Sequence, residues 1–339
     1  MELFDERIKN YLLVHGRYAN DLQNDRGGFP ADRNGPWNEN VTEARITAHW
    51  AILLLACFRL TGDDSYRQAS EKAYQFLLGD KLTGKGRLFF CRKTKWKSQT
   101  NGLVGQAWIC ESLLHAYIYL EKDLYIEKAL EVIRLHRFDQ LSCLWHNSKL
   151  DGTSDGLNRT LNQQVFFSSI ALLVAGYAND RSLFDKVNAF YQTLSIKTNF
   201  LSDGLIHHKI SLTKANGLCS LAKLRSFLDV RGWHIQSTGY LSFILYGLTL
   251  AKIGYIKFNK NRCDEVDALA HCILSYLDQY FPFGCGQKEN PFRWAYNPTG
   301  IEVALAIKTF QWRGRYKAQD WWNLQIEHYC DRQGLMNQS

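Results

Sequence analysis

Residues 100–136 read TNGLVGQAWICESLLHAYIYLEKDLYIEKALEVIRLH, and this stretch decides the fold. Its first half is apolar on nearly every side, which predicts a helix buried on most faces. Its second half alternates an apolar face through Leu124, Leu130 and Ile133 with charged positions such as Glu127 and Lys128, which predicts a surface helix. The stretch therefore predicts a hairpin of one buried and one exposed helix.

The same plan returns along the chain. Related units begin near residues 42, 101, 162, 238 and 297, so the spacing is close to sixty residues except for one longer gap. A period of this kind indicates an array or a closed ring of helical hairpins. The helix expected at residues 3–18, together with an extra segment at 212–230, could supply a sixth hairpin. We therefore expect an all-α fold, an (α/α)6-type toroid that occupies residues 1–339 as one domain.

Composition limits the classes of partner. The chain has a net charge of +8 and 46% hydrophobic residues, but the densest basic cluster, at residues 91–97, is typical of a solvated loop. We expect an anionic partner and no nucleic acid. The sequence has no GxGxxG or GxxxxGK[ST] motif, which argues against a nucleotide-binding fold. We also expect no metal and no cofactor, because the nine cysteines include no CxxC pair or Cys/His cluster.

The first residues of the chain and its longest apolar run indicate where in the cell the protein is expected. The opening MELFDERIKN is charged and lacks the apolar core of a secretory signal, and the longest apolar run, residues 50–58, is too short to cross a bilayer. Several cysteines occupy apolar helical positions and are expected to be reduced. We therefore expect a cytoplasmic protein without a membrane span.

One rim of the ring is expected to carry the site. Long loops precede the buried helices at residues 21–40, 79–100, 137–161, 198–237 and 281–298, whereas the turns on the other side are short. The long loops share short apolar or aromatic runs, which predict small strand-like hairpins. Such asymmetry is typical of a functional face.

The chain resembles the six-hairpin glycosidase superfamily of (α/α)6 toroids. The residues that carry the likeness are TGDDSYRQASEKAYQFL, NGLVGQAWICESLLHAYIYL and DGLIHHKI, at residues 61–77, 101–120 and 203–210. The superfamily includes unsaturated glucuronyl hydrolases, N-acylglucosamine 2-epimerase-like proteins and several polysaccharide lyases, and the chain is similar to uncharacterised members found with bacterial surface-polysaccharide genes. The resemblance implies a carbohydrate-active enzyme, but no segment matches the catalytic aspartate motif of the glucuronyl hydrolases.

Candidate site residues lie in the long loops and at the starts of the buried helices. An acid and a second carboxylate are needed for glycoside hydrolysis, and a proton-transferring His or Tyr for elimination or epimerisation. The candidates for these roles are Glu43, His146, Asp151, Asp155, His208, His234, Tyr240 and Glu302. Aromatic, amide and arginine side chains suit sugar faces and carboxylates. The substrate-binding candidates are Trp37, Gln106, Trp145, Arg159, Gln163, Trp233, Arg293, Trp294 and Tyr296.

Several readings stay open. The acids and Asn101 could cap helices or form turns, and the aromatic residues could lock loops onto the toroid. Gln106 is expected to face the cavity, because a buried helix otherwise gives an amide no reason to be there. The leading hypothesis is a hydrolase, lyase or epimerase acting on an acidic, uronate-containing saccharide. The alternative is a glycan-binding or polysaccharide-assembly protein that keeps the toroid without a reaction.

A closed ring gathers the starts of the inner helices at one mouth. Gln106, Arg159, Gln163, Tyr240 and Glu302 are therefore predicted to converge on one pocket, where helix dipoles favour an anion. The preceding loops should supply its rim through Trp37, Trp145, His146, His208, Trp233 and Trp294.

Overall fold

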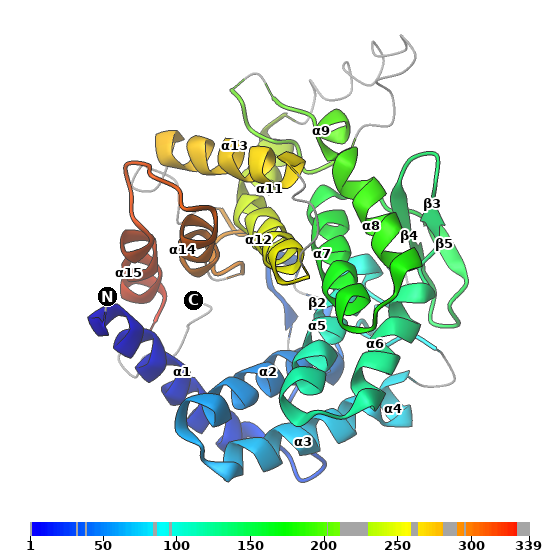
Figure 1. Ribbon diagram of the computed structural model, residues 1–339. Coiled ribbons are helices and arrows are strands. Elements are labelled where there is room, and N and C mark those ends of the chain that lie inside the picture. The colour runs from blue at the N-terminus through cyan, green and yellow to red at the C-terminus, as the bar shows by residue number, and fades with distance from the viewer. Residues whose placement is uncertain are drawn as a thin grey trace.

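The computed structural model describes the chain except for residues 1, 32, 38, 84–86, 95–96, 202, 211–229, 259–263, 281–289, 295 and 331–339. Inner and outer helices alternate around a ring (Figure 1). The inner helices are α2 (Glu43–Thr61), α5 (Gly102–Leu120), α7 (Leu161–Tyr177), α12 (Leu241–Lys257) and α14 (Thr299–Phe310). Their outer partners are α3 (Asp64–Leu78), α6 (Asp123–Arg134), α8 (Arg181–Gln192), α13 (Asp264–Tyr280) and α15 (Ala318–Tyr329). The expected toroid of helical hairpins is confirmed.

Each inner helix packs against the next, from α2 through α5, α7 and α12 to α14. The first helix, α1 (Glu2–Leu22), packs on α2 and meets α15, where the rings of Tyr11 and Trp322 lie 5.6 Å apart. It thus lies where the ring closes (Figure 1). The extra segment expected to complete a sixth hairpin lies outside the described residues.

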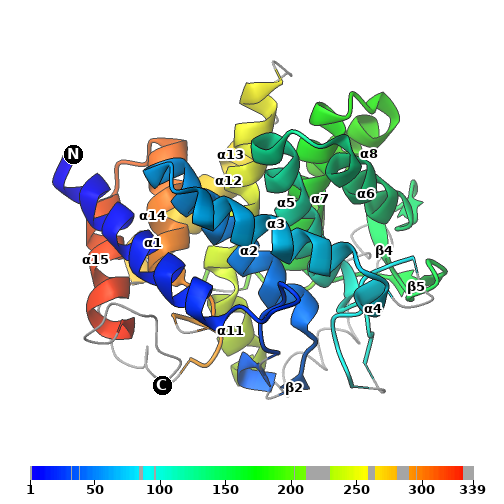
Figure 2. The same cartoon turned by 90° about the horizontal axis from the view of Figure 1, so that it is seen from below.

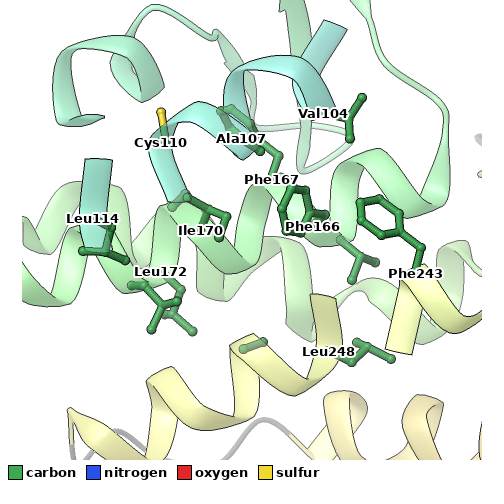
Figure 3. Close-up of a cluster of buried hydrophobic side chains, with 14 of the residues drawn as sticks. Val104, Ala107, Cys110, Leu114, Phe166, Phe167, Ile170, Leu172, Phe243 and Leu248 are labelled. Atoms are coloured by element: carbon green, nitrogen blue, oxygen red, sulfur yellow. The ribbon is translucent and has the colours of Figure 1, made fainter. Parts of the chain in front are cut away.

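The inner helices are apolar because they are covered on most sides. Phe166 and Phe167 of α7 are fully buried, and Phe243 of α12 lies 5.0 Å from Phe166 between ring centroids. Figure 3 shows side chains of α5, α7 and α12 meeting in this core. Gly247 permits the close approach of α12 to α7, because a Cβ there would lie 2.9 Å from Val165 Cγ1. The apolar residues of the inner helices are therefore explained by packing on two sides of each helix.

The long loops carry the remaining elements. They hold the two-residue strands β1 (Arg33–Asn34) and β2 (Glu39–Asn40), the 3-10 turn η1 (Gly35–Trp37) and the short helices α4 (Asp80–Thr83) and α9 (Leu194–Lys197). A small antiparallel sheet follows α6, with strand order β3 (Phe138–Asp139), β4 (Leu144–Ser148) and β5 (Ser154–Leu157). Figure 2 shows α4, β2 and helix α11 (Val230–Gly239) on one side of the ring.

Strand-like hairpins were expected in four long loops, at residues 88–90, 144–146, 205–208 and 281–283, and this is only partly correct. The run at 144–146 forms β4, but Leu88, Phe89 and Phe90 form no strand, and Ile206 makes only an isolated bridge to Phe200. Residues 281–283 lie outside the described chain. The segment before the fourth inner helix is also different from the expected loop, because residues 230–239 form α11.

Two glutamines fix the long loops to the inner helices. Gln106 of α5 accepts a hydrogen bond from the Phe89 backbone N–H at 3.0 Å and donates to the carbonyls of Phe89 and Thr100, both at 2.9 Å. Gln164 of α7 repeats the pattern on Trp145, with the N–H at 3.1 Å and the carbonyl at 2.8 Å, and donates to Asn158 O at 2.7 Å. Both side chains are fully buried. Each therefore gives buried backbone groups of a loop a side-chain partner.

This bracing predicts a large difference between neighbouring glutamines. Gln164→Leu should lower the free energy of unfolding by about 2–4 kcal/mol, because the buried Trp145 N–H and Asn158 carbonyl lose this side-chain partner and the Trp145 carbonyl keeps the Asn158 N–H, at 3.1 Å. Gln163→Leu is the matched control, since among the described residues Gln163 Oε1 accepts from Asn158 Nδ2 alone, at 2.8 Å, and should cost less than about 1 kcal/mol. Urea unfolding of both variants measures the difference. Equal losses would contradict the bracing role.

Candidate functional site

Two adjoining cavities occupy the middle of the ring. The upper cavity, about 390 Å³, lies at the starts of α5, α7 and α12 and is lined by Asn101, Asn162, Gln163, His208, Lys209 and Tyr240 among others. The lower cavity, about 430 Å³, runs along α2, α5 and α14. Trp108, Phe243, Tyr296 and Asn297 line both. These four residues therefore form the boundary that the two cavities share.

Glu302 places a carboxyl in the lower cavity. It lies in the first turn of α14 and is only 7% exposed. Burial raises its pKa to about 7, partly offset by a hydrogen bond with the Ser242 side chain. Its Oε2 atom has no hydrogen-bond partner among the described residues. A buried carboxyl of this kind is half protonated at neutral pH and can give or take a proton.

Glu111 supplies a second buried carboxyl to the same cavity. It lies in the middle of α5 and is 6% exposed. Burial raises its pKa to about 7, while the Tyr246 hydroxyl donates a short hydrogen bond to its Oε1 and opposes the rise. The pKa of Tyr246 is in turn raised by burial, by Glu111 and by Glu302. The negative charges of both carboxyls therefore act on the Tyr246 hydroxyl, and all three side chains line the lower cavity.

Helix α2 adds a cation and an imidazole to the lower cavity, which also holds the two carboxyls. The guanidinium of Arg45 lies 4.0 Å from the centroid of the Trp108 ring, and burial lowers its pKa. His49, one turn further on, packs edge-on against Trp108 at 5.6 Å between centroids. Burial and then the charge of Arg45 lower the pKa of His49 to about 3, so its imidazole is neutral at pH 7. The lower cavity thus combines two carboxyls, a cation, a neutral imidazole and an indole.

The upper cavity carries positive charge. Arg92, Lys97 and Lys209 line it, and the carboxylate of Glu39 pairs with Arg92 at 3.4 Å and with Lys97. Lys209 donates to Thr160 Oγ1 at 3.0 Å. Burial and the nearby Arg159 lower the pKa of Lys209, as expected where cations crowd. Three cations against one carboxylate leave this end of the cavity attractive to an anion.

Polar and aromatic groups complete the upper cavity. Asn162 is 5% exposed, and its Oδ1 has no hydrogen-bond partner among the described residues. Trp37 is 40% exposed at the mouth, where Lys97 Nζ lies 4.9 Å from its ring centroid. Hydroxyl donors of a sugar and its apolar ring face would satisfy such groups.

The structure brings some of the sequence candidates to this space. Trp37, Gln163, His208, Tyr240 and Tyr296 line the upper cavity, and Glu302 and Tyr296 the lower one. Burial lowers the pKa of His208 to about 3, and its Nδ1 lies 3.1 Å from Ser237 Oγ. Burial raises the pKa of Tyr240. Gln163 and Tyr240 therefore meet at the upper cavity, whereas Glu302, which was predicted to share their pocket, lines the lower one.

Other candidates lie elsewhere. Asp151 caps a turn by accepting from the Thr153 N–H at 2.9 Å, and His146 contacts Ser154 Oγ at 2.9 Å on β4. His234 pairs with Asp203 at 3.0 Å on the surface. The candidates outside both lining sets are Glu43, Gln106, Trp145, His146, Asp151, Asp155, Arg159, Trp233, His234, Arg293 and Trp294.

Three expected cavity residues instead brace the loops. Gln106 does not face the cavity, because its amide is used up by Phe89 and Thr100. Trp145 is 1% exposed and donates to Ser168 Oγ at 3.0 Å. Trp294 is 2% exposed and stacks on Tyr329. The expectation that these side chains line the pocket is wrong, since each fixes a loop to a helix.

The arginine candidates also face away from the predicted place. Arg159 is exposed, and its guanidinium donates to the Ile210 carbonyl at 3.2 Å, so the expected fork into the ring is wrong. Arg293 donates to Thr238 O at 3.4 Å, and burial lowers its pKa to about 10. Trp233 lies in α11, and its side chain is outside the described part of the chain.

Sequence reasoning missed Arg45, His49, Glu111 and Tyr246. A signal was present, because Arg45 and His49 are one turn apart in an apolar helix, and Glu111 interrupts the most hydrophobic helix of the repeat. A charge in an apolar inner helix needs a partner or a function, and this is as true of Glu111 as of Glu302.

Comparisons with solved structures define the class. A cellobiose 2-epimerase from Bacillus thermoamylovorans superposes with a TM-score of 0.69 at 12% identity, covering 99% of this chain and 90% of that one. An unsaturated glucuronyl hydrolase specific for heparin gives 0.62 at 13% identity, with 99% and 89% covered. An inactive α-1,6-mannanase variant from Salegentibacter sp., in complex with α-1,6-mannotetrose, gives 0.62 at 11% identity, with 97% and 90% covered. These likenesses show that the chain has the (α/α)6 toroid fold of these enzymes.

No protein-family model matches the chain. Archaeal glycosylation protein Q of Haloferax volcanii is 31% identical over an alignment of 343 residues, which covers 96% of this chain and 90% of that protein. The chain therefore belongs to the family of archaeal glycosylation protein Q.

The apolar inner helix α2 also has the length of a membrane span. Among the described residues it is the one helix that is long and apolar enough to cross a membrane. Its apolar 18-residue stretch has a mean hydropathy of 1.2, and only 39% of that stretch is buried. In this structure α2 is an inner helix of the ring, and Arg45, His49, Ile52, Leu53 and Ala56 line the lower cavity.

The buried carboxyls predict a pH dependence of stability. Because the folded-state pKa of Glu302 is about 7 and its ordinary value is 4.5, the native state holds a proton that the unfolded chain releases, so stability falls as pH rises from 4.5 to 7 and then levels off. Glu302→Gln should remove a part of this fall on the order of 3 kcal/mol. Thermal unfolding between pH 4.5 and 8 measures it.

The exposed Asp155→Asn is the control and should follow the wild type, since its side chain reaches water. A Glu302→Gln variant whose stability falls with pH as steeply as the wild type would argue against a protonated Glu302 in the folded state.

Proposed function

We propose that this protein is a glycoside hydrolase that cleaves an acidic, uronate-containing saccharide in the two adjoining cavities. The observation that carries the proposal is the pair of buried carboxyls, Glu111 and Glu302, in one cavity and each with a pKa of about 7. Near neutral pH such a pair includes a form with one carboxyl protonated and the other ionised. This is the state that glycoside hydrolysis needs.

The roles follow from the contacts of each carboxyl. Glu111 accepts the Tyr246 hydroxyl, which favours its ionised form, whereas Oε2 of Glu302 lacks a partner. Glu302 gives its proton to the glycosidic oxygen as the C–O bond breaks. Glu111 takes a proton from the water whose oxygen bonds to the sugar carbon. The products are a sugar with a free anomeric hydroxyl and the departing alcohol, and solvent restores both carboxyls.

Positive charge supports an acidic substrate. At the upper cavity three cations, Arg92, Lys97 and Lys209, outnumber the single carboxylate of Glu39. Arg45 of α2 lies over the ring of Trp108, which lines both cavities. The chain's net charge of +8 favours the approach of an anion. One structural neighbour is named as a glucuronyl hydrolase specific for heparin, and the family relative is named as a glycosylation protein, which fits work on a saccharide.

The cysteines support a reducing compartment for this enzyme. Cys57, Cys91, Cys110, Cys143 and Cys272 form no disulfide in the described part of the chain. Burial raises the pKa of Cys110 and holds it as a thiol. A cytoplasmic location is part of this proposal.

The reaction is tested with a panel of uronate oligosaccharides and the same panel with the carboxylates reduced to alcohols. New reducing ends, without the absorbance of a new double bond, are expected, with the acidic panel preferred and kcat/KM highest near pH 7. Product with a double bond would mean elimination, and an interconverted sugar without cleavage would mean epimerisation. Binding without any turnover would support the alternative, a non-catalytic glycan-binding protein.

The carboxyl roles are tested with two isosteric variants. Glu302→Gln and Glu111→Gln should each lower kcat by about 10²–10⁴-fold, because each removes proton transfer and keeps the shape of the side chain. Asp151→Asn is the control, since Asp151 serves a turn outside both cavities, and should keep wild-type kcat. Far-UV circular dichroism checks folding. Wild-type turnover in either glutamine variant would refute the assignment.

A further inference from the structure

The cavity changes character along the ring axis. On α2 the lining side chains are Arg45 and His49 and then, toward the helix C-terminus, Ile52, Leu53 and Ala56. On α14 Leu305 follows Glu302, and α1 adds Leu12. At a rise of about 1.5 Å per residue, Ile52, Leu53 and Ala56 extend the lining about 5–10 Å beyond His49 along α2. On α2 the charged and imidazole side chains therefore precede the aliphatic ones.

This aliphatic end is accessible. Leu305 keeps 37% of its surface exposed although it belongs to an inner helix, and less than half of the apolar window of α2 is buried. His115 is the polar group there, and burial lowers its pKa, so its imidazole is neutral at pH 7. Its ring stacks on Tyr119 at 5.9 Å between centroids. Accessible apolar surface in a cavity gains free energy when an apolar group covers it.

We infer that the end of the lower cavity formed by Leu12, Ile52, Leu53, Ala56 and Leu305 is a binding site for an apolar aglycone. The saccharide occupies the basic and amide-lined end, its glycosidic oxygen lies at Glu302, and the leaving alcohol carries an alkyl or similar apolar group. A second sugar would place most of its hydroxyls against aliphatic side chains, with the His115 imidazole as the polar group there. The inference rests on the proposed function for the sugar end only.

Three probes separate the two ends of the cavity. Calorimetry on the full chain compares methyl β-glucuronide, n-hexyl β-glucuronide and 1-hexanol. The hexyl glycoside should bind at least tenfold more tightly than the methyl glycoside, which corresponds to burying about two methylene groups. 1-Hexanol should compete with the hexyl glycoside and not with the methyl glycoside.

A matched pair of variants locates the effect. Leu305→Asn should abolish most of the tenfold gain, and Leu60→Asn should keep it, because Leu60 is similarly exposed at 41% but does not line the cavity. A hexyl glycoside that binds no more tightly than the methyl glycoside, or a gain that Leu305→Asn leaves intact, overturns the inference and leaves the carboxyl assignment standing.

The remaining outcomes separate this inference from the proposed function. If 1-hexanol and the hexyl glycoside bind through Leu305 but methyl β-glucuronide does not bind, the apolar site stands and the acidic-sugar proposal fails. If none of the three probes binds, both are overturned.

Discussion

The ring depends on one constraint: long loops that cover the inner helices must keep their buried backbone groups paired. Gln106 and Gln164 meet it with the same three-bond pattern on Phe89 and Trp145, although they lie in different hairpins. Each bond adds only about 0.5–1.5 kcal/mol, but an unpaired buried group would cost more. Because the loops are fixed in this way, the side chains that follow them at Asn101 and Asn162 hold their places in the upper cavity.

The same inner helices explain the unusual carboxyls. A helix packed on both neighbours has no polar face, so Glu111 and Glu302 cannot reach bulk water and pay for burial with raised pKa values of about 7. The cost is opposed only in part, by the Tyr246 hydroxyl at Glu111 and the Ser242 side chain at Glu302. Stability is therefore given up at the place where a proton can be exchanged at neutral pH.

The repeat could be predicted from the sequence, and the direction of single side chains could not. Helix starts expected near 42, 101, 162, 238 and 297 lie within a few residues of α2, α5, α7, α12 and α14, because hydrophobic periodicity is a property of many residues together. Gln106 and Gln163 occupy comparable places at helix starts, yet one binds a loop and the other lines the cavity. A rotation of one residue, about 100°, separates these outcomes, and helix ends are uncertain by that much.

The position of a residue along an inner helix also has a chemical meaning. Asn162 and Gln163 lie in the first turn of α7 beside a long loop, and Glu302 lies in the first turn of α14, whereas Glu111 lies more than two turns into α5. The cations Arg92, Lys97 and Lys209 come from the loops, so Glu111 is set deeper than the groups that attract an anion and leaves them available to a substrate. A sugar carboxylate drawn to that end would present its glycosidic bond toward the ring centre. The depth of Glu111, and not the number of carboxyls alone, therefore supports the acidic saccharide proposed as the substrate.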